Sequence, residues 1–570
     1  MAFTAPVPEP GRYGTGTGAA DVVGEGGGTD DGAPAPEAEA PRRITRLDHS
    51  RDGVGYLRDR PSCLFVVDLG GVPGADHGSG GSSGPDGAVP DDPVRLTDRA
   101  VSVEDPAWTP DGRRLVVVVP RDGDRTETLH RDLGAVPADA AAPVLPEPVV
   151  RGAGDVARPV VSDDGTVYFY GTEFRGFAAV ARNTGLWAAT LPDPGTVATP
   201  RRLTDAETVD CARDAGPPAP YGDGVLVALL HRGAVELRSV PRDGDRVDLT
   251  GLTVLSGGRA AVRGFAVDGT RIAVVRAGPA DTGEVTVLGS DGTETTPTDF
   301  SAPLRAAGVR PAEELSTHAP DGYPVHGWLV RPDGPGPHPV LLVVHGGPFA
   351  QYEWSLFDEA QVYASAGYAV VLGNPRGSAG YGQRHARAVL GRFGTVDADD
   401  LLALLDAALA RPGTDADRVG VMGGSYGGFM TGWLAAHHGQ RFRAAWSERA
   451  VNAWDSFTGS SDIGWWFADE YVGADPERQR AASPLTHADR ITLPFAVVHS
   501  EQDLRCPIEQ AQRMFVALRR NGTEAELLVF PGEGHELTRS GRPRHRVQRF
   551  EAVLDWWHRH LPVGEEPPAG

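Results

Sequence analysis

One short stretch constrains the fold of this chain more than any other, and it runs from residue 419 to residue 437. Residues 419–422 are apolar, as is typical of the end of a buried strand, and residues 429–437 are apolar enough for a buried helix. Between them stands Gly423-Gly424-Ser425-Tyr426-Gly427, a G-x-S-x-G sequence. In this context the pattern predicts a sharp strand-to-helix turn with a strained backbone, which exposes the Ser425 hydroxyl at the carboxyl edge of a sheet. Because the chain has 74 glycines, the pattern alone can arise by chance, and a catalytic interpretation requires partners for the serine.

Length and composition indicate a globular chain of more than one domain. The 570 residues are 40% hydrophobic, with a mean hydropathy of −0.27. No apolar run reaches the roughly 18 residues that would cross a bilayer. The first residues lack the basic region and apolar core of a signal peptide. We therefore expect a cytoplasmic protein that does not bind membranes.

Charge and cysteine content exclude several other classes. The formal net charge of −23 disfavours nucleic acid as a partner. The three cysteines, Cys63, Cys211 and Cys506, are odd in number and far apart, which argues against a disulfide framework and against a metal cluster. We expect no metal and no organic cofactor.

The first half of the chain predicts a β-rich domain after a disordered start. Residues 1–40 are mostly small or polar, too poor in large apolar side chains to offset the entropy of ordering, and residues 70–92 read as a flexible loop. From 41 to 308, short β-rich stretches alternate with Asp-Gly turns in a loose repeat of roughly 40–50 residues, which predicts a β-propeller of six or seven blades. A pair of β-sandwiches is the alternative. The expected strands include 64–69, 115–119, 167–170, 225–230, 272–275 and 284–288.

The second half predicts an α/β-hydrolase domain over residues 309–562, followed by a flexible tail at 563–570. Strands and helices alternate here, which favours a mostly parallel, doubly wound sheet covered on both faces. The expected strands are 325–330, 340–344, 368–372, 495–499 and 526–530. The expected helices include 357–366, 397–410 and 547–560.

A nucleophilic serine needs a base, and the base needs a carboxylate to orient it. In α/β-hydrolase order these follow the serine as an acidic residue and then a histidine. Asp503 lies just past one expected strand and His535 just past the next, so both belong to loops at the carboxyl edge of the sheet. Rival side chains stand near both positions: Glu501, Asp489, His487, His499 and His545.

An oxyanion site needs backbone N–H donors next to the serine. One would be the N–H of Tyr426, at the start of the helix. The other would come from the loop after the strand at 340–344, where Gly346 and Gly347 are able to turn an N–H into the site because they lack a Cβ atom. The sequence leaves the choice between these two glycines open.

Together these motifs resemble the catalytic domain of the prolyl oligopeptidase family of serine peptidases, and in particular its acylaminoacyl-peptidase branch. The similarity covers residues 311–562. It rests on the motifs at 345–348, 374–382, 423–428 and 460–464, on the Asp503 segment and on Gly534-His535.

The resemblance implies Ser425 as nucleophile, Asp503 as orienting carboxylate and His535 as base, with oxyanion donors from Gly347 and Tyr426. It also implies a preceding β-propeller that admits short peptides and excludes folded proteins. Members of the family commonly associate, so a homo-oligomer is possible.

Four further residues are candidates for substrate binding, each with a structural alternative. Glu173 would bind a substrate amine, or it is an edge-strand carboxylate. Arg505 would hold a substrate carbonyl or carboxylate, or it forms a structural ion pair. Trp465 and Phe457, within an aromatic group, would wall the pocket for the residue before the scissile bond, or they pack in the core.

The sequence therefore predicts a serine peptidase that hydrolyses short peptides through an acyl-enzyme, either an acylaminoacyl-peptidase or a related exopeptidase or oligopeptidase. Three alternatives stay open: a dipeptidyl aminopeptidase of the same family, a carboxylesterase, and, in a different class, a non-catalytic propeller scaffold.

Overall fold

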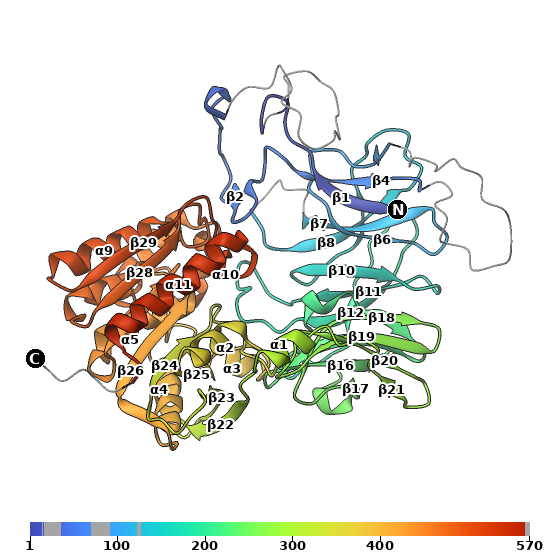
Figure 1. Ribbon diagram of the computed structural model, residues 1–570. Helices are drawn as coiled ribbons and strands as arrows, with labels where there is room; N and C mark the ends of the chain where they lie inside the picture. Colours follow the sequence, from blue (N-terminus) through green and yellow to red (C-terminus); the bar gives the residue numbers. More distant parts are fainter. Residues whose placement is uncertain (14, 16–35, 70–91, 122–126, 565–570) are drawn as a thin grey trace, which may run out of the picture. The chain divides into compact units, whose positions relative to one another are not determined.

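The computed structural model describes residues 1–13, 15, 36–69, 92–121 and 127–564 (Figure 1). The chain divides into two compact units, and each is built from several segments. Unit 1 comprises Met1–His49, Tyr56–Gly176 and Leu186–Arg202, and unit 2 comprises Ser50–Gly55, Phe177–Gly185 and Leu203–Gly570. Most of the stretches expected to be disordered or flexible (16–35, 70–91 and 565–570) lie outside the described residues.

Unit 1 consists of small antiparallel sheets. Two of them have four strands that follow one another in chain order, β6-β7-β8-β9 and β10-β11-β12-β13, and a third has the order β1-β4-β5. The strands of the first are β6 (Glu104–Trp108), β7 (Arg114–Pro120), β8 (Arg131–Pro137) and β9 (Glu147–Val150). The second contains β10 (Val156–Val161), β11 (Thr166–Gly171), β12 (Gly185–Thr190) and β13 (Arg201–Arg202).

The structure corrects the expectation of disorder over residues 1–40 at the very start of the chain. Ala2–Pro6 forms strand β1, which pairs antiparallel with β4 (Ser62–Val66), and β4 pairs in turn with β5 (Val94–Arg95). A paired strand satisfies its backbone groups without large apolar side chains. Phe3 adds a stacked contact with Phe65, with ring centroids 5.6 Å apart.

Unit 2 contains a further β-rich part, an eight-stranded sheet in which two four-stranded antiparallel portions follow one another. They are joined by one parallel pairing, between Val235 and Ala261. The strands are β14 (Ala219–Tyr221), β15 (Gly224–His231), β16 (Ala234–Pro241), β17 (Thr253–Ser256), β18 (Ala261–Asp268), β19 (Arg271–Ala277), β20 (Glu284–Leu288) and β21 (Glu294–Thr295). Four-stranded antiparallel sheets in chain order are the building blocks of β-propellers. Closure into a propeller and the number of blades stay predictions.

The remainder of unit 2 is an α/β domain around one eight-stranded sheet with the order β22-β23-β25-β24-β26-β27-β28-β29. The two pairings that involve β23 are antiparallel and the other five are parallel, which confirms the mostly parallel sheet. The strands are β22 (Ala312–His318), β23 (Pro324–Val330), β24 (His338–Val344), β25 (Ala369–Asn374), β26 (Thr414–Gly424), β27 (Ala444–Glu448), β28 (Phe495–Ser500) and β29 (Ala525–Phe530).

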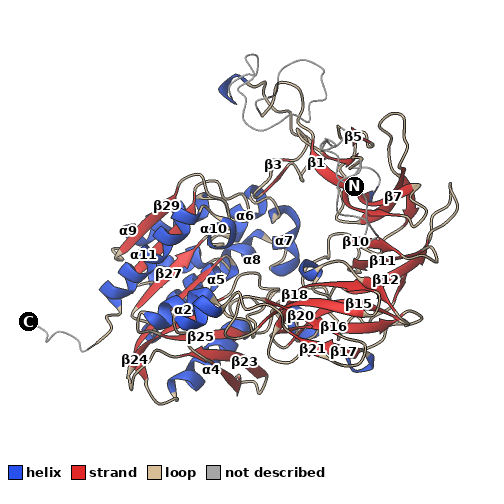
Figure 2. Cartoon of the chain, turned by 45° about the vertical axis from the view of Figure 1, so that its right-hand side comes forward, coloured by secondary structure: helices blue, strands red, loops and turns tan. Residues whose placement is uncertain are grey.

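Helices cover both faces of this sheet (Figure 2). Strand β24 shows why: Val340, Leu342 and Val344 point into one hydrophobic core and the intervening Leu341 and Val343 into another. Helices α4 (Val396–Leu409), α5 (Tyr426–His437) and α9 (Glu509–Arg520) bury side chains in the first core. Helices α2 (Asp358–Ser365) and α11 (Pro543–His560) bury theirs in the second. The shorter helices are α1 (Ala302–Ala306), α3 (Gln383–Arg387), α6 (Trp454–Ser460), α7 (Gly464–Tyr471), α8 (Pro476–Ala481) and α10 (Leu537–Ser540).

Candidate active site

Ser425 stands at the turn between β26 and α5, and its backbone is strained there. Its φ is 61° and its ψ is −120°, a region that residues with a side chain rarely occupy. Two backbone hydrogen bonds hold the turn: Ser425 N–H donates to Glu448 O at 3.0 Å, and Phe429 N–H donates to Ser425 O at 2.9 Å. This is the geometry expected of a nucleophile elbow.

Two glycines allow the neighbouring strand to approach the elbow. A Cβ atom on Gly427 would lie 2.1 Å from the carbonyl oxygen of Val344, and one on Gly423 would lie 2.5 Å from the same atom. Both distances are shorter than any real Cβ contact, so only glycine fits between β24 and the turn.

The predicted carboxylate and histidine meet directly. Asp503 follows β28, His535 follows β29, and Asp503 Oδ2 accepts a hydrogen bond from His535 Nδ1 at 2.8 Å. The other carboxylate oxygen accepts from the N–H of Cys506, also at 2.8 Å. Among the rivals, His499 also lies beside the carboxylate, with its Nε2 3.6 Å from Asp503 Oδ2 and 2.6 Å from Cys506 O.

Burial and nearby charges set the protonation of this pair. Burial lowers the pKa of His535, and the guanidinium groups of Arg449 and Arg505 lower it further by repelling a protonated ring. Burial raises the pKa of Asp503. The neighbouring His499, the N–H of Cys506 and the charge of Arg449 counteract part of that rise. At neutral pH the histidine is therefore a neutral base with a free Nε2 lone pair, oriented by a carboxylate.

The loop after β24 passes over the serine. A Cβ atom on Gly346 would lie 3.5 Å from Ser425 Cβ, and Gly347 next to it has a φ of 122°, which favours glycine. The His345 side chain fixes this loop: its Nδ1 donates to Gly346 O at 2.7 Å, and its Nε2 accepts from the Ser378 hydroxyl at 3.0 Å. Gly346 thus lies against the Ser425 turn, and both candidate glycines line the same cavity as Ser425.

The side chain of Tyr426, the first residue of α5, is anchored in the core. Its hydroxyl donates to Asp397 Oδ2 at 2.8 Å, and both residues are buried. Burial raises the pKa of Asp397 to about 6. This hydrogen bond holds Tyr426 in place, and the backbone N–H of Tyr426 is the first of helix α5, directly after Ser425.

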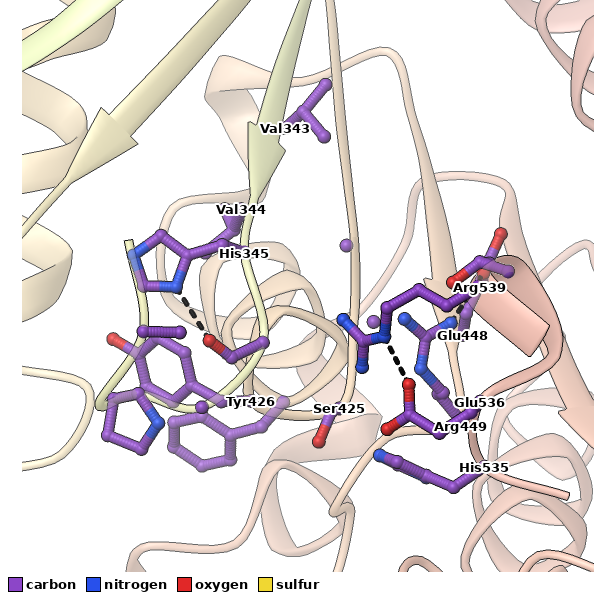
Figure 3. A pocket seen from close by; sticks show the side chains of 18 of the residues that line it. Val343, Val344, His345, Ser425, Tyr426, Glu448, Arg449, His535, Glu536 and Arg539 are labelled. Carbon is purple, nitrogen blue, oxygen red and sulfur yellow. Dashed lines mark hydrogen bonds and ion pairs between the residues drawn. The ribbon is translucent and has the colours of Figure 1, made fainter. Parts of the chain in front are cut away.

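Ser425, His535, Gly347 and Tyr426 line one cavity of about 480 Å³. Figure 3 shows Ser425 between the turn at His345 on one side and His535, Glu536 and Arg449 on the other. The cavity has an apolar wall and a charged wall. The apolar wall is formed by Val451, Trp454, Phe457, Ile463 and Phe467. The charged wall includes Glu448, Arg449, Arg505, Glu536, Arg539 and Arg549.

The two predicted aromatic residues have different places. Phe457 lines the cavity, whereas Trp465 is not among the lining residues that the structure describes, which corrects the prediction for Trp465. Helix periodicity explains the difference: Ile463 and Phe467, four positions apart, share the face toward the cavity, and Trp465 is turned away from it. Its ring makes an edge contact with Phe177, with centroids 5.2 Å apart.

Arg505 and Glu173, the two charged candidates, are also separated. Arg505 lines the cavity, but its Nε donates to Asp462 Oδ1 at 2.7 Å, which is the ion pair given above as the alternative. Glu173 is an exposed residue of unit 1, just after β11, and its role in binding a substrate amine stays a prediction.

Sequence reasoning missed the buried charges behind the serine. Glu448, at the end of β27, accepts from Arg549 Nε at 2.8 Å and from Arg449 Nη1 at 3.2 Å. Arg449 has a φ of 37°, and its guanidinium packs on Gly424, where a Cβ atom would lie 2.7 Å from Cζ. The only signal in the sequence is a charged pair that directly follows an apolar stretch.

The described residues offer neither a metal site nor a membrane span. Among them, no group of three or more His, Cys, Asp or Glu side chains is placed to hold a metal ion. No helix in the described part of the chain combines the length and the apolar character needed to cross a membrane.

The sheet order, the strained serine after β26 and the Asp–His pair on the loops after β28 and β29 define an α/β-hydrolase domain with a nucleophile elbow. Within this class, residues 354–563 match the model of the prolyl oligopeptidase family.

Individual proteins show the same similarity. The uncharacterized peptidase YuxL of Bacillus subtilis is 44% identical over 257 residues, which are 44% of this chain and 39% of that protein. An acylamino-acid-releasing enzyme of Arabidopsis thaliana is 30% identical over 233 residues, 39% of this chain and 30% of the enzyme. The chain thus matches about a third of the length of these relatives.

A solved structure matches more of the chain. The acylaminoacyl peptidase of Pyrococcus horikoshii superimposes with a TM-score of 0.75 at 25% identity. The superposition covers 94% of this chain and 79% of the archaeal one. The likeness therefore extends beyond the family match into the β-rich part.

Proposed function

We propose that this protein is a serine peptidase that hydrolyses short peptides through an acyl-enzyme, with an acylaminoacyl-peptidase type of specificity. The observation that carries the proposal is the 2.8 Å hydrogen bond between Asp503 and His535 beside a serine with a strained backbone, with serine and histidine lining one cavity. The family match of residues 354–563 supports the same reaction class.

In the proposed reaction, His535 Nε2 takes the proton of the Ser425 hydroxyl as Ser425 Oγ attacks the scissile carbonyl carbon. Asp503 holds the ring and stabilises the imidazolium that forms. The tetrahedral oxyanion accepts hydrogen bonds from the N–H groups of Gly347 and Tyr426. The imidazolium then protonates the leaving amine, the C–N bond breaks, and water releases the acyl group by the same steps in reverse.

The apolar wall of the cavity suggests which substrates react. Trp454, Phe457 and Phe467 belong to this wall, so we propose that they hold an apolar side chain of the residue that forms the acyl-enzyme. Arg505 forms an ion pair with Asp462, and its side chain is one-third exposed. We propose that it donates to a substrate oxygen only through the N–H groups that Asp462 does not use.

We propose further that the antiparallel sheets of both units form a β-propeller that restricts access to short peptides. The superposition on the Pyrococcus horikoshii acylaminoacyl peptidase supports this fold. We expect a cytoplasmic enzyme with no nucleic acid and no membrane as partner, and possible self-association. The three cysteines are free and buried, as in proteins of a reducing compartment.

The test is a substrate panel assayed with wild type, Ser425→Ala and the control Ser460→Ala. Ser460 is an exposed serine of α6 whose hydroxyl donates to Ser456 O of its own helix at 2.8 Å. The panel contains acetyl-Phe, acetyl-Ala and acetyl-Glu anilides, the free-amine counterparts, a dipeptidyl anilide and a p-nitrophenyl ester.

Turnover of acetyl-Phe anilide by wild type and Ser460→Ala, with no turnover by Ser425→Ala, is the expected result. Cleavage restricted to free-amine dipeptides would replace the assignment with a dipeptidyl aminopeptidase and would make Glu173→Gln the next variant. Ester hydrolysis without amide cleavage would reject the peptidase assignment. If no substrate of the panel is turned over, the non-catalytic propeller scaffold is the assignment that remains.

A further inference from the structure

Six residues far from the rest of the α/β domain in sequence belong to unit 2: Ser50–Gly55. They comprise strand β2 (Ser50–Arg51) and a tight turn, in which Val54 N–H donates to Arg51 O at 3.0 Å. The turn presents the side chain of Asp52. This carboxylate is partly buried against the loops that carry Asp503 and His535.

Asp52 accepts hydrogen bonds from both of these loops at once. Its Oδ1 accepts from the N–H of Leu504, the residue next to Asp503, at 2.9 Å. Its Oδ2 accepts from the N–H of His535 itself at 3.1 Å, and Oδ1 lies 3.3 Å from the same nitrogen. One carboxylate therefore joins the two loops through backbone atoms, independently of the bond between Asp503 and His535.

Asp52 is itself held in place. Its N–H donates to Asp462 Oδ2 at 2.9 Å, and Asp462 in turn pairs with Arg505, two residues after Asp503. A Cβ atom on Gly534 would lie 3.4 Å from either carboxylate oxygen, so the loop before His535 passes directly over the group. Asp52 thus both donates to and accepts from the residues around it, and the Gly534 backbone packs against its carboxylate.

We propose that Asp52 is a positioning residue for the proposed peptidase reaction: it fixes the Asp503 loop relative to the His535 loop, so that the base is aligned on Ser425. The inference rests on the proposed function. A carboxylate has two acceptor oxygens and no hydrogen to oppose either N–H group, and its charge strengthens both bonds. Aspartate on a tight turn meets this requirement.

The isosteric variant Asp52→Asn gives the sharpest test, because it keeps the size of the side chain. The amide is uncharged and has one acceptor oxygen: with that oxygen on Leu504 N–H, its NH2 group would replace Oδ2 opposite the His535 N–H and leave only the longer 3.3 Å contact. A displacement of the base by a fraction of an ångström lowers kcat steeply. We expect kcat to fall about 10-fold for Asp52→Asn and about 100-fold for Asp52→Ala, with KM changed less than about threefold.

The pH profile separates positioning next to the base from a general loss of structure. The charged or titratable groups around His535 are Asp503, Glu536 and Asp52, which favour the imidazolium, and Arg449, Arg505 and His499, which disfavour it. Removing the Asp52 charge lowers the pKa of His535. The acid limb of kcat should therefore move to lower pH in Asp52→Asn.

The matched control is Asp248→Asn. Asp248 likewise accepts from two backbone N–H groups, those of Thr250 and Gly251, but at an exposed turn of the β-rich part of unit 2. The variant makes the same chemical change and removes the same charge away from the cavity. We expect its kcat and its pH profile to match those of wild type.

The labelling rate of Ser425 by a fluorophosphonate probe, measured beside peptide turnover, distinguishes a failure of the proposed function from a failure of the positioning role. If wild type is not labelled, the proposed function fails and the role of Asp52 fails with it. If wild type is labelled and Asp52→Asn keeps its labelling rate, kcat and acid limb, the positioning role alone is rejected. If the melting temperature of Asp52→Asn is close to that of Asp248→Asn, the Asp52→Asn variant is folded. Its kinetics then test the positioning role even where Asp52→Ala does not fold.

Discussion

Replacement of the buried carboxyl of Asp397 should change how the stability of unit 2 depends on pH. Burial raises the pKa of Asp397 from 3.8 to about 6 in the folded chain. The folded state then binds more protons than the unfolded state between these two values. The free energy of unfolding therefore falls as the pH rises through this range and levels off above it.

The size of the effect follows from the shift. A shift of about two pKa units corresponds to about 3 kcal/mol over the whole range. Between pH 5 and pH 8 the linkage relation gives about 1.4 kcal/mol of that amount. The variant Asp397→Asn has no titrating group at this position and keeps one acceptor for the Tyr426 hydroxyl. The free energy of unfolding of Asp397→Asn should therefore not include the fall of about 1.4 kcal/mol between pH 5 and pH 8.

Urea titration followed by tryptophan fluorescence measures the right part of the molecule. Of the 11 tryptophans, all but Trp108 and Trp187 belong to unit 2. The matched control is Asp399→Asn, an exposed aspartate in the same first turn of α4. We expect wild type and Asp399→Asn to lose stability in parallel from pH 5 to pH 8, and Asp397→Asn to lose about 1.4 kcal/mol less. Three parallel curves would refute the raised pKa and the reasoning from burial.

Two further predictions concern the elbow and the base. Replacing Arg449 by Gln removes a positive charge that disfavours the protonated ring of His535. The acid limb of kcat/KM should therefore move to higher pH, the direction opposite to that expected for Asp52→Asn. An acid limb at the wild-type pH would contradict this. Gly427→Ala, whose Cβ would lie 2.1 Å from Val344 O, should lower the free energy of unfolding by more than about 3 kcal/mol. Its control Gly459→Ala has nothing within 4 Å of the new Cβ and should be neutral or stabilising by up to about 1 kcal/mol; equal denaturation midpoints for the two variants would disprove the steric explanation.

The residues that the sequence predicted best are those that local pattern and strand order determine together. Ser425 follows a buried strand and precedes a helix, and Asp503 and His535 each follow a later strand of the same sheet. Parallel strands bring such loops to one edge, so the order of the strands predicts that Asp503 and His535 lie near each other, while rivals such as His499 stayed open until the family resemblance selected the pair.

Other residues carried no such signal. The orientation of Trp465 depends on the rotation of a short helix, which the composition of an aromatic cluster does not reveal. Strand β1 depends on pairing with Ser62–Val66, some 60 residues away, rather than on its own side chains. Asp52 meets a loop 483 positions later in the chain, and an Asp-Gly turn in a β-rich stretch looks like any other.

That last separation bears on how the protein is made. During synthesis the Ser50–Gly55 turn leaves the ribosome long before the loops that it joins, and the parallel strands that position those loops also pair across long stretches of chain. Contacts of such high sequence separation form late in folding, after most of the loop-closure entropy has been paid. A nascent chain therefore holds the turn long before it holds the Asp503 and His535 loops, so the site can assemble only after synthesis has passed residue 535.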